Sequence, residues 1–240
     1  MANILAIDTS TAWCSVALSL DGREPTFRHG PVSAGASQLL LPWVEEMLNE
    51  SKISLKDLSA IAVGIGPGAF TGVRLGVAAV QGLAMSNQLP VISISSLDAI
   101  AAQVAHTDGF KKALPSHFAI AVDARMDEIY WAQYLVQEQQ LPLRMGDIHL
   151  SKPEDIDLSG ISFLAGSAIK EYGDRLPCSG NASNGSIALD PDISVSALGV
   201  LECAKQHYRA GLLQDVRSLE PLYIRNKVAL TTAERLEAYK

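Results

Sequence analysis

Two stretches of the chain share one pattern, and that pattern constrains the fold more than any other feature. The first, "NILAIDTSTAWCSVALSL", begins at Asn3, and the second, "HFAIAVDARMDEIYWAQYL", begins at His117. Each reads as an apolar strand that ends in an aspartate, followed by a short polar turn and an alternating strand. Asp8 and Asp123 hold the same place in the two stretches. We therefore predict that one α/β unit is duplicated, which gives two lobes, each with a mixed sheet flanked by helices.

The rest of the chain supplies the remaining elements of these lobes. Asp21 and Gly22 predict a hairpin turn into a third strand. Apolar residues at three- and four-residue steps in "SQLLLPWVEEML" predict an amphipathic helix. Further strands are expected at 60–65 and 90–95, and further helices at 71–86, 96–105 and 196–210. The predicted domains are a first lobe, 1–109, and a smaller second lobe, 110–240, whose last 20 or so residues pack back on the first.

Composition narrows the function classes. Hydrophobic residues make up 48% and charged residues 19%, which is typical of a globular protein. The net charge is −7 and no basic patch is visible, so any work on RNA is expected to go through a partner. Cys14, Cys178 and Cys203 are widely spaced, which predicts buried or half-buried thiols rather than disulfides or a zinc site. No membrane span and no signal peptide are recognisable, which favours the cytosol.

The stretch "AIAVGIGPGAFTGVRLGVAAVQGLA", residues 60–84, is rich in glycine and invites a nucleotide-binding interpretation. Gly64 and Gly66 formally begin a dinucleotide-binding pattern, but no acidic residue follows about 20 positions later and Pro67 lacks an N–H group. The helix after the turn has glycine or alanine along one side, which lets another backbone approach closely. That backbone could belong to the chain's own sheet or to a partner's helix. The residues of this side are Gly72, Gly76, Ala79 and Gly82.

The polar turns after the two repeated strands are the other candidate site. Asp8, Thr9, Ser10 and Thr11 could hold the metal-bound phosphate of a nucleotide, with Asp123 as the matching residue of the second lobe. Such turns also bond commonly to their own backbone, and both interpretations stay open. The five histidines are dispersed and no G-x-S-x-G motif is present. We predict no catalytic residue and no metal ligand, and treat these turns as a vestigial nucleotide site.

Several motifs together resemble the bacterial TsaB (YeaZ) family, in family order along nearly the whole chain. They are "ILAIDTSTAWCSVAL", "GIGPGAFTGVRLGVAAVQGLA", "ISSLDAIA", "VDARMDEIYWAQY" and "PLYIRN". The resemblance implies a two-lobe fold of the actin/Hsp70/sugar-kinase (ASKHA) kind. It also implies a non-catalytic subunit in the formation of threonylcarbamoyladenosine, beside the anticodon of tRNAs that read codons beginning with A.

The resemblance further implies partners. A TsaD-like transferase carries the catalytic metal, a TsaE-like ATPase joins through the complex, and the chain pairs with itself when alone. No cofactor is expected in the chain itself, and ATP or ADP is expected only at the joint with the transferase. Contact with tRNA is expected only indirectly, through the partners.

The family's pairing surface falls on two of the predicted helices. The candidate interface residues are Leu40, Trp43, Val44 and Met47 in the first helix and Gly72, Leu75, Gly76, Ala79 and Val80 in the second. On this hypothesis, Gly76→Leu abolishes pairing and leaves the fold intact. The chain departs from the family pattern at Ala36, where a histidine is common, which puts any role of that histidine in doubt here.

Two alternatives belong to other functional classes. The first is an ATP-dependent phosphotransferase of the same fold, which requires nucleotide at the turns Asp8–Thr11 and Asp123–Arg125. The second, less favoured, is a glycoprotease-like peptidase, for which neither a triad nor a metal-ligand pair is recognisable.

Overall fold

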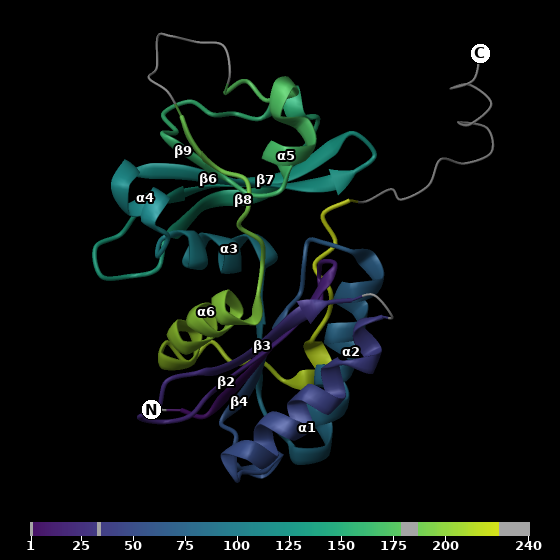
Figure 1. Ribbon diagram of the computed structural model, residues 1–240. Coiled ribbons are helices and arrows are strands. Elements are labelled where there is room, and N and C mark those ends of the chain that lie inside the picture. The colour runs from purple at the N-terminus through teal and green to yellow at the C-terminus, as the bar shows by residue number, and fades with distance from the viewer. Residues whose placement is uncertain (1, 33–34, 179–186, 226–240) are drawn as a thin grey trace, which may run out of the picture.

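The computed structural model describes residues 2–32, 35–178 and 187–225, and shows two lobes, each built on a five-stranded sheet (Figure 1). The sheet orders are β3-β2-β1-β4-β5 and β10-β9-β6-β7-β8. In each sheet the first strand pairs antiparallel with the second and parallel with the fourth. The two orders are the same when β1 is matched with β6, which confirms the predicted duplication and the two-lobe α/β fold.

The bounds of the elements follow. The strands are β1 (Ile4–Asp8), β2 (Trp13–Ser19), β3 (Thr26–Pro31), β4 (Ala60–Gly64), β5 (Val91–Ile94), β6 (His117–Arg125), β7 (Glu128–Leu135), β8 (Leu143–Ser151), β9 (Phe163–Ala165) and β10 (Ala188–Asp190). The α-helices are α1 (Leu40–Ser51), α2 (Phe70–Asn87), α3 (Ser96–Val104), α4 (Asp108–Ala113), α5 (Ala168–Tyr172) and α6 (Ala197–Arg209).

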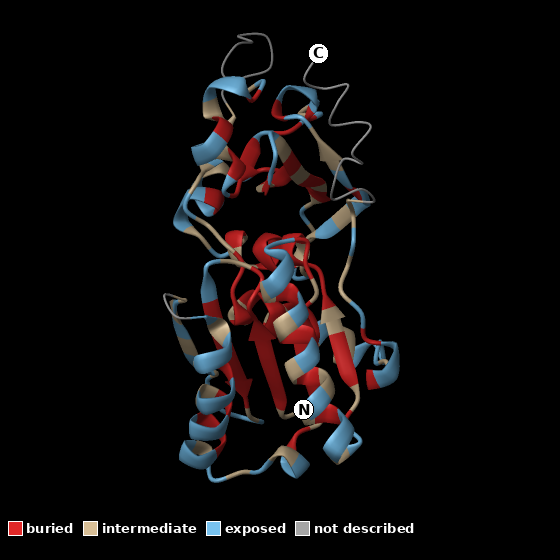
Figure 2. Ribbon diagram, turned by 90° about the vertical axis from the view of Figure 1, so that its right-hand side faces the viewer, coloured by how far each residue is buried: buried red, intermediate tan, exposed pale blue. Residues whose placement is uncertain are grey.

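Helices α1 and α2 cover one face of the first sheet. Their apolar stripes pack on side chains of β1, β2 and β4 in one buried cluster. Figure 2 looks onto this side: the outward turns of the helices are exposed or half-buried, and the strands behind them are buried. Strands β1 and β4 are buried along their whole length because helices cover both faces of the sheet. This burial on both faces also explains why β1 and β4 read as continuous apolar runs in the sequence.

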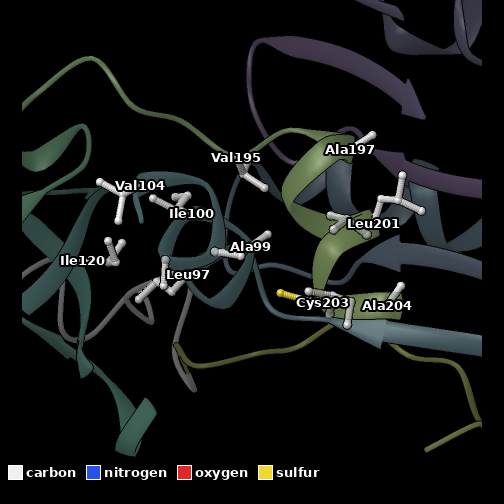
Figure 3. Close-up of a cluster of buried hydrophobic side chains, with 14 of the residues drawn as sticks. Leu97, Ala99, Ile100, Val104, Ile120, Val195, Ala197, Leu201, Cys203 and Ala204 are labelled. Atoms are coloured by element: carbon white, nitrogen blue, oxygen red, sulfur yellow. The ribbon is translucent and has the colours of Figure 1, made fainter. Parts of the chain in front are cut away.

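The second face of the first sheet is covered by α6, which contacts β1, β2, β4 and β5. The prediction that residues 110–240 form the second lobe is therefore wrong for α6, which belongs to the first lobe. Helix α3 lies between α6 and the second sheet, so it leaves the first sheet's face open for α6. Figure 3 shows the result, a continuous core in which Ile100 of α3 and Leu201 of α6 lie in one cluster with Ile120 of β6. The two lobes share this core.

The chain after α6 returns along the first lobe and then reaches the second, as the yellow segment beside α2 in Figure 1 shows. Gln81 of α2 donates from Nε2 to the Leu219 carbonyl oxygen at 2.9 Å. The Leu222 N–H donates to the Ile65 carbonyl oxygen at 2.8 Å. One sequence prediction reaches beyond the described residues, namely the packing of the last 20 or so residues, the last fifteen of which lie outside them.

Candidate functional site

A cleft of about 610 Å³ lies between the lobes. The first lobe lines it with Ser10 to Trp13 and Pro67 to Phe70, and the second lobe lines it with Val122 to Arg125. Residues 221–225 form a further part of its wall. Because β1 and β6 are equivalent strands, the duplication brings both repeated turns to this one cleft.

Asp8 ends β1 but lies beneath the cleft surface, with 1% of its surface exposed. Its carboxylate accepts hydrogen bonds from the Ser10 backbone N–H at 3.0 Å and from the Ser10 hydroxyl at 3.1 Å. Burial raises the pKa of Asp8 to about 6, against the opposing effect of these hydrogen bonds. A side chain at Gly64, on neighbouring β4, would collide with this carboxylate. Thus Gly64 makes room for Asp8.

The first predicted nucleotide turn is therefore only partly at the cleft. Thr9 is buried, and its hydroxyl donates to the Gly72 carbonyl oxygen at 2.7 Å. Ser10 and Thr11 do line the cleft, whereas Asp8 and Thr9 do not. The prediction is wrong for Asp8 and Thr9 as direct ligands, because the turn bonds to its own chain.

The second turn brings Asp123 to the cleft. The Asp123 carboxylate accepts hydrogen bonds from the Arg125 backbone N–H at 2.8 Å and from the Tyr172 hydroxyl at 2.9 Å. The Arg125 guanidinium pairs with the other carboxylate oxygen at 3.2 Å. Burial and the Asp123 carboxylate together raise the pKa of Tyr172 to about 12, so this hydroxyl remains a donor. Both repeated aspartates are thus engaged by the chain's own donors.

The glycine-rich turn packs against the first repeated turn. A Cβ at Gly68 would collide with the Ser10 carbonyl oxygen, and one at Gly72 with the Thr9 carbonyl oxygen. The Ala69 N–H, which a phosphate would need, donates to the Ser10 carbonyl oxygen at 2.7 Å. The close approach that Gly68 and Gly72 allow is therefore to the chain's own backbone.

The predicted partner-facing residues separate into two groups. Five of them are buried within the first lobe, so the prediction that they face a partner is wrong for these residues. They are Leu40, Val44, Met47, Gly76 and Val80. A Cβ at Gly76 would lie 2.7 Å from the Thr9 hydroxyl oxygen. The physical reason is that the apolar stripe of each helix covers the lobe's own sheet. The other four, Trp43, Gly72, Leu75 and Ala79, are half-buried.

The outward side of α2 contains residues that the predicted interface did not include. Ala78, Gly82 and Met85 are exposed, and apart from α2's own backbone no atom of the described residues lies within 4 Å of a Cβ placed on Gly82. No charged residue occurs from Leu75 to Asn87. This absence of charge from an exposed helix was the available signal. Ala36, at the histidine position, is half-buried and packs on the same core as α1.

Three further features bear on the sequence predictions. Cys14 and Cys203 are buried and Cys178 is half-buried, all three as free thiols, as predicted. In the described parts of the chain, no three His, Cys, Asp or Glu side chains are grouped to hold a metal ion. None of the described helices has the length and apolarity to cross a membrane.

Comparison with known proteins gives the family. The model of the family described as "TsaD: tRNA N6-adenosine threonylcarbamoyltransferase" matches residues 32–226. The tRNA threonylcarbamoyladenosine biosynthesis protein TsaB of Escherichia coli K12 is 36% identical over 94% of this chain and 96% of its own length. The TsaB protein of Haemophilus influenzae is 33% identical, with 94% of each chain covered. The structure of YeaZ from Pseudomonas aeruginosa, 36% identical, superposes with a TM-score of 0.79 over 93% of this chain and 100% of its own. The chain belongs to the TsaB (YeaZ) family.

Proposed function

We propose that the chain is a cytosolic, non-catalytic subunit in the formation of threonylcarbamoyladenosine on tRNA, and that it binds and supports a TsaD-like transferase. Its relatives carry the name of this biosynthesis. In the proposed complex the transferase performs the chemistry, a TsaE-like ATPase joins through the complex, and tRNA is bound through the partners. The chain pairs with itself when no transferase is present.

One observation carries the partner role, namely the outward side of α2. Leu75, Ala78, Ala79, Gly82 and Met85 form an uncharged surface of mostly small side chains. Depletion of charge is typical of the core of a protein interface, and small side chains let a partner helix pack closely. Because α1 lies on the same face of the sheet, the two helices together offer a surface for a pair of partner helices (Figure 1).

The state of the two repeated turns supports a non-catalytic role. Asp8 is bonded to Ser10 beneath the cleft, and Asp123 is bonded to Arg125 and Tyr172. A phosphotransferase would need these carboxylates for its metal and nucleotide, so the structure gives that alternative less support. ATP or ADP is proposed to bind only where the transferase completes a site.

The test compares two exposed helix glycines, Gly82 in α2 and Gly109 in α4, where an added Cβ would meet no described atom outside the helix backbone within 4 Å. We expect Gly82→Leu to lose binding to the TsaD-like protein of the same organism, measured by light scattering and calorimetry, and to lose modification in a reconstituted tRNA assay. Gly109→Leu should retain both. Gly76→Leu is not informative, because its side chain would disrupt the Thr9 turn.

Two outcomes would contradict the proposal. If the wild-type chain neither binds the transferase nor affects modification, the partner role is wrong. If micromolar ATP binds the isolated chain and Asp123→Ala, at the repeated aspartate that lines the cleft, abolishes that binding, the phosphotransferase alternative is favoured instead.

A further inference from the structure

Beside the uncharged side of α2 lies a cluster of two aromatic rings and an arginine. Phe70 and Arg74 are one turn apart at the start of α2, and Tyr223 comes from the C-terminal segment. The Arg74 guanidinium carbon lies 3.8 Å from the Phe70 ring centroid and 5.6 Å from that of Tyr223. Arg74 Nε also donates to the Tyr223 hydroxyl at 2.9 Å. The arginine is thus stacked on one ring and hydrogen-bonded to the other.

Tyr223 is held by hydrogen bonds of the residues that flank it in the sequence. The Leu222 N–H donates to the Ile65 carbonyl oxygen at 2.8 Å, and Arg225 Nη2 donates to the Ala124 carbonyl oxygen at 3.2 Å. The tyrosine is therefore held between an anchor on the first lobe and one on the second. Because the guanidinium is held before any partner arrives, less conformational entropy is lost on binding.

The remaining donors of Arg74 are directed to no group that the structure describes. Among the described residues, only Nε of Arg74 has a hydrogen-bond partner, and Arg74 takes part in no ion pair. Other arginines do form ion pairs with carboxylates, namely Arg28, Arg125, Arg144, Arg175, Arg217 and Arg225. Phe70 and Tyr223 are 50% and 52% exposed, so the cluster is open to a partner. A planar guanidinium whose two terminal nitrogens bond to no described group matches a carboxylate in bidentate geometry.

The charges around the cluster favour a protein partner. Arg74 directly precedes the uncharged run that begins at Leu75, whereas the exposed part of α1 carries Glu45, Glu46 and Glu50. The net charge of −7 disfavours a phosphate backbone as the occupant. Arginine and tyrosine are also the residue types enriched among the dominant contacts of protein interfaces.

We propose that the Phe70–Arg74–Tyr223 cluster binds an aspartate or glutamate side chain of the TsaD-like transferase, at the end of the α2 surface. The inference rests on the proposed function and deepens it. Arg74 fixes the direction in which the partner helix lies along the uncharged face, which small apolar residues alone specify poorly.

The experiment measures the affinity of the full chain for the TsaD-like protein by calorimetry. We expect Arg74→Ala to weaken binding roughly 30-fold or more, as for a dominant interface residue, and Arg74→Lys to restore only part of it. Tyr223→Phe, which keeps the ring and loses the hydroxyl, should weaken binding several-fold. Arg209→Ala, at an exposed arginine of α6 on the opposite face of the sheet, should change it less than about twofold.

A charge exchange identifies the partner group. Arg74→Glu should be rescued by changing one acidic residue of the transferase to arginine, and the double-mutant cycle should show coupling. Added salt should weaken the wild-type complex more than the Arg74→Ala complex.

The outcomes separate this inference from the proposed function. If the wild-type chain binds and Arg74→Ala binds equally well, the cluster is not a contact and the partner role stands. If Arg74→Ala leaves transferase affinity unchanged and weakens retention of tRNA by the complex, the anion is a phosphate and the inference is wrong. If the wild-type chain does not bind the transferase, both are wrong.

Discussion

The carbonyl oxygen of Thr9 occupies the space that a side chain at position 72 would need, so α2 and the first repeated turn touch through their backbones. The Thr9 hydroxyl reinforces this contact by donating to the Gly72 carbonyl oxygen. The glycine therefore determines how close α2 lies to the end of β1. This contact positions both the uncharged side of α2 and one wall of the cleft.

We expect Gly72→Ala to lower the free energy of unfolding by about 3 kcal/mol or more, since a Cβ there meets rigid backbone. Gly82→Ala is the matched change in the same helix, at an open position. It should raise the free energy of unfolding by up to about 1 kcal/mol through helix propensity. Urea denaturation of both variants checks the pair. Equal effects would mean that the Thr9 contact does not constrain position 72.

Asp8 predicts a pH dependence of stability. Its folded-state pKa of about 6 lies above the ordinary value of 3.8, so the folded protein holds this proton more tightly than the unfolded chain. The resulting stabilisation is complete below about pH 4 and is lost as the pH rises to about 6. Asp8→Asn should therefore gain stability relative to wild type by about 2–3 kcal/mol between pH 4 and pH 7. Urea titrations at several pH values measure this difference, and a difference that does not change with pH would contradict the assignment.

Arg225 is predicted to stabilise the turn of the second repeat. Arg125, Met126 and Asp127 have φ values of 62°, 58° and 60°, a left-handed conformation that is unfavourable for residues other than glycine. Arg225 Nη2 donates to the carbonyl oxygens of Ala124 and Arg125, each at 3.2 Å. Arg225→Ala should lower the free energy of unfolding by about 2 kcal/mol and speed amide exchange in the turn.

Arg217→Ala is the control for that change, because Arg217 is exposed and pairs only with nearby Asp215 among the described residues. It should leave exchange in the turn unchanged. If both variants exchange alike, Arg225 does not stabilise the turn.

Tyr134 is predicted to tie the second sheet to α3. Its side chain is 1% exposed and its hydroxyl donates to the Asp98 carboxylate at 2.9 Å. Arg144 of β8 reaches the same carboxylate oxygen at 3.2 Å. Tyr134→Phe removes the hydroxyl and keeps the ring, and should lower the free energy of unfolding by about 1–3 kcal/mol, because the bond to a charged group is lost. Tyr208→Phe, at a half-buried tyrosine of α6, should have little effect in the same urea titration.

The elements found from the sequence alone are those with a strong local signal. The two repeated strand pairs and the helices α1, α2, α3 and α6 carry clear apolar periodicity. The short elements α4 and β10 and the largely exposed strand β8 were not predicted, because a weakly amphipathic segment gives little periodic signal.

The sequence by itself determined the duplicated unit, the amphipathic helices and the family, because local patterns of residues indicate each of them. Only the tertiary structure decided which side of each helix is free. Apolar periodicity shows that α1 and α2 bury a face, but it cannot tell a sheet of the same chain from a partner's helix, because both offer the same apolar contact. The structure placed Met47 and Val80 in the core and left Ala78 and Gly82 outside. It also brought Tyr223 to Arg74 across 149 residues of sequence, a contact that no local pattern encodes.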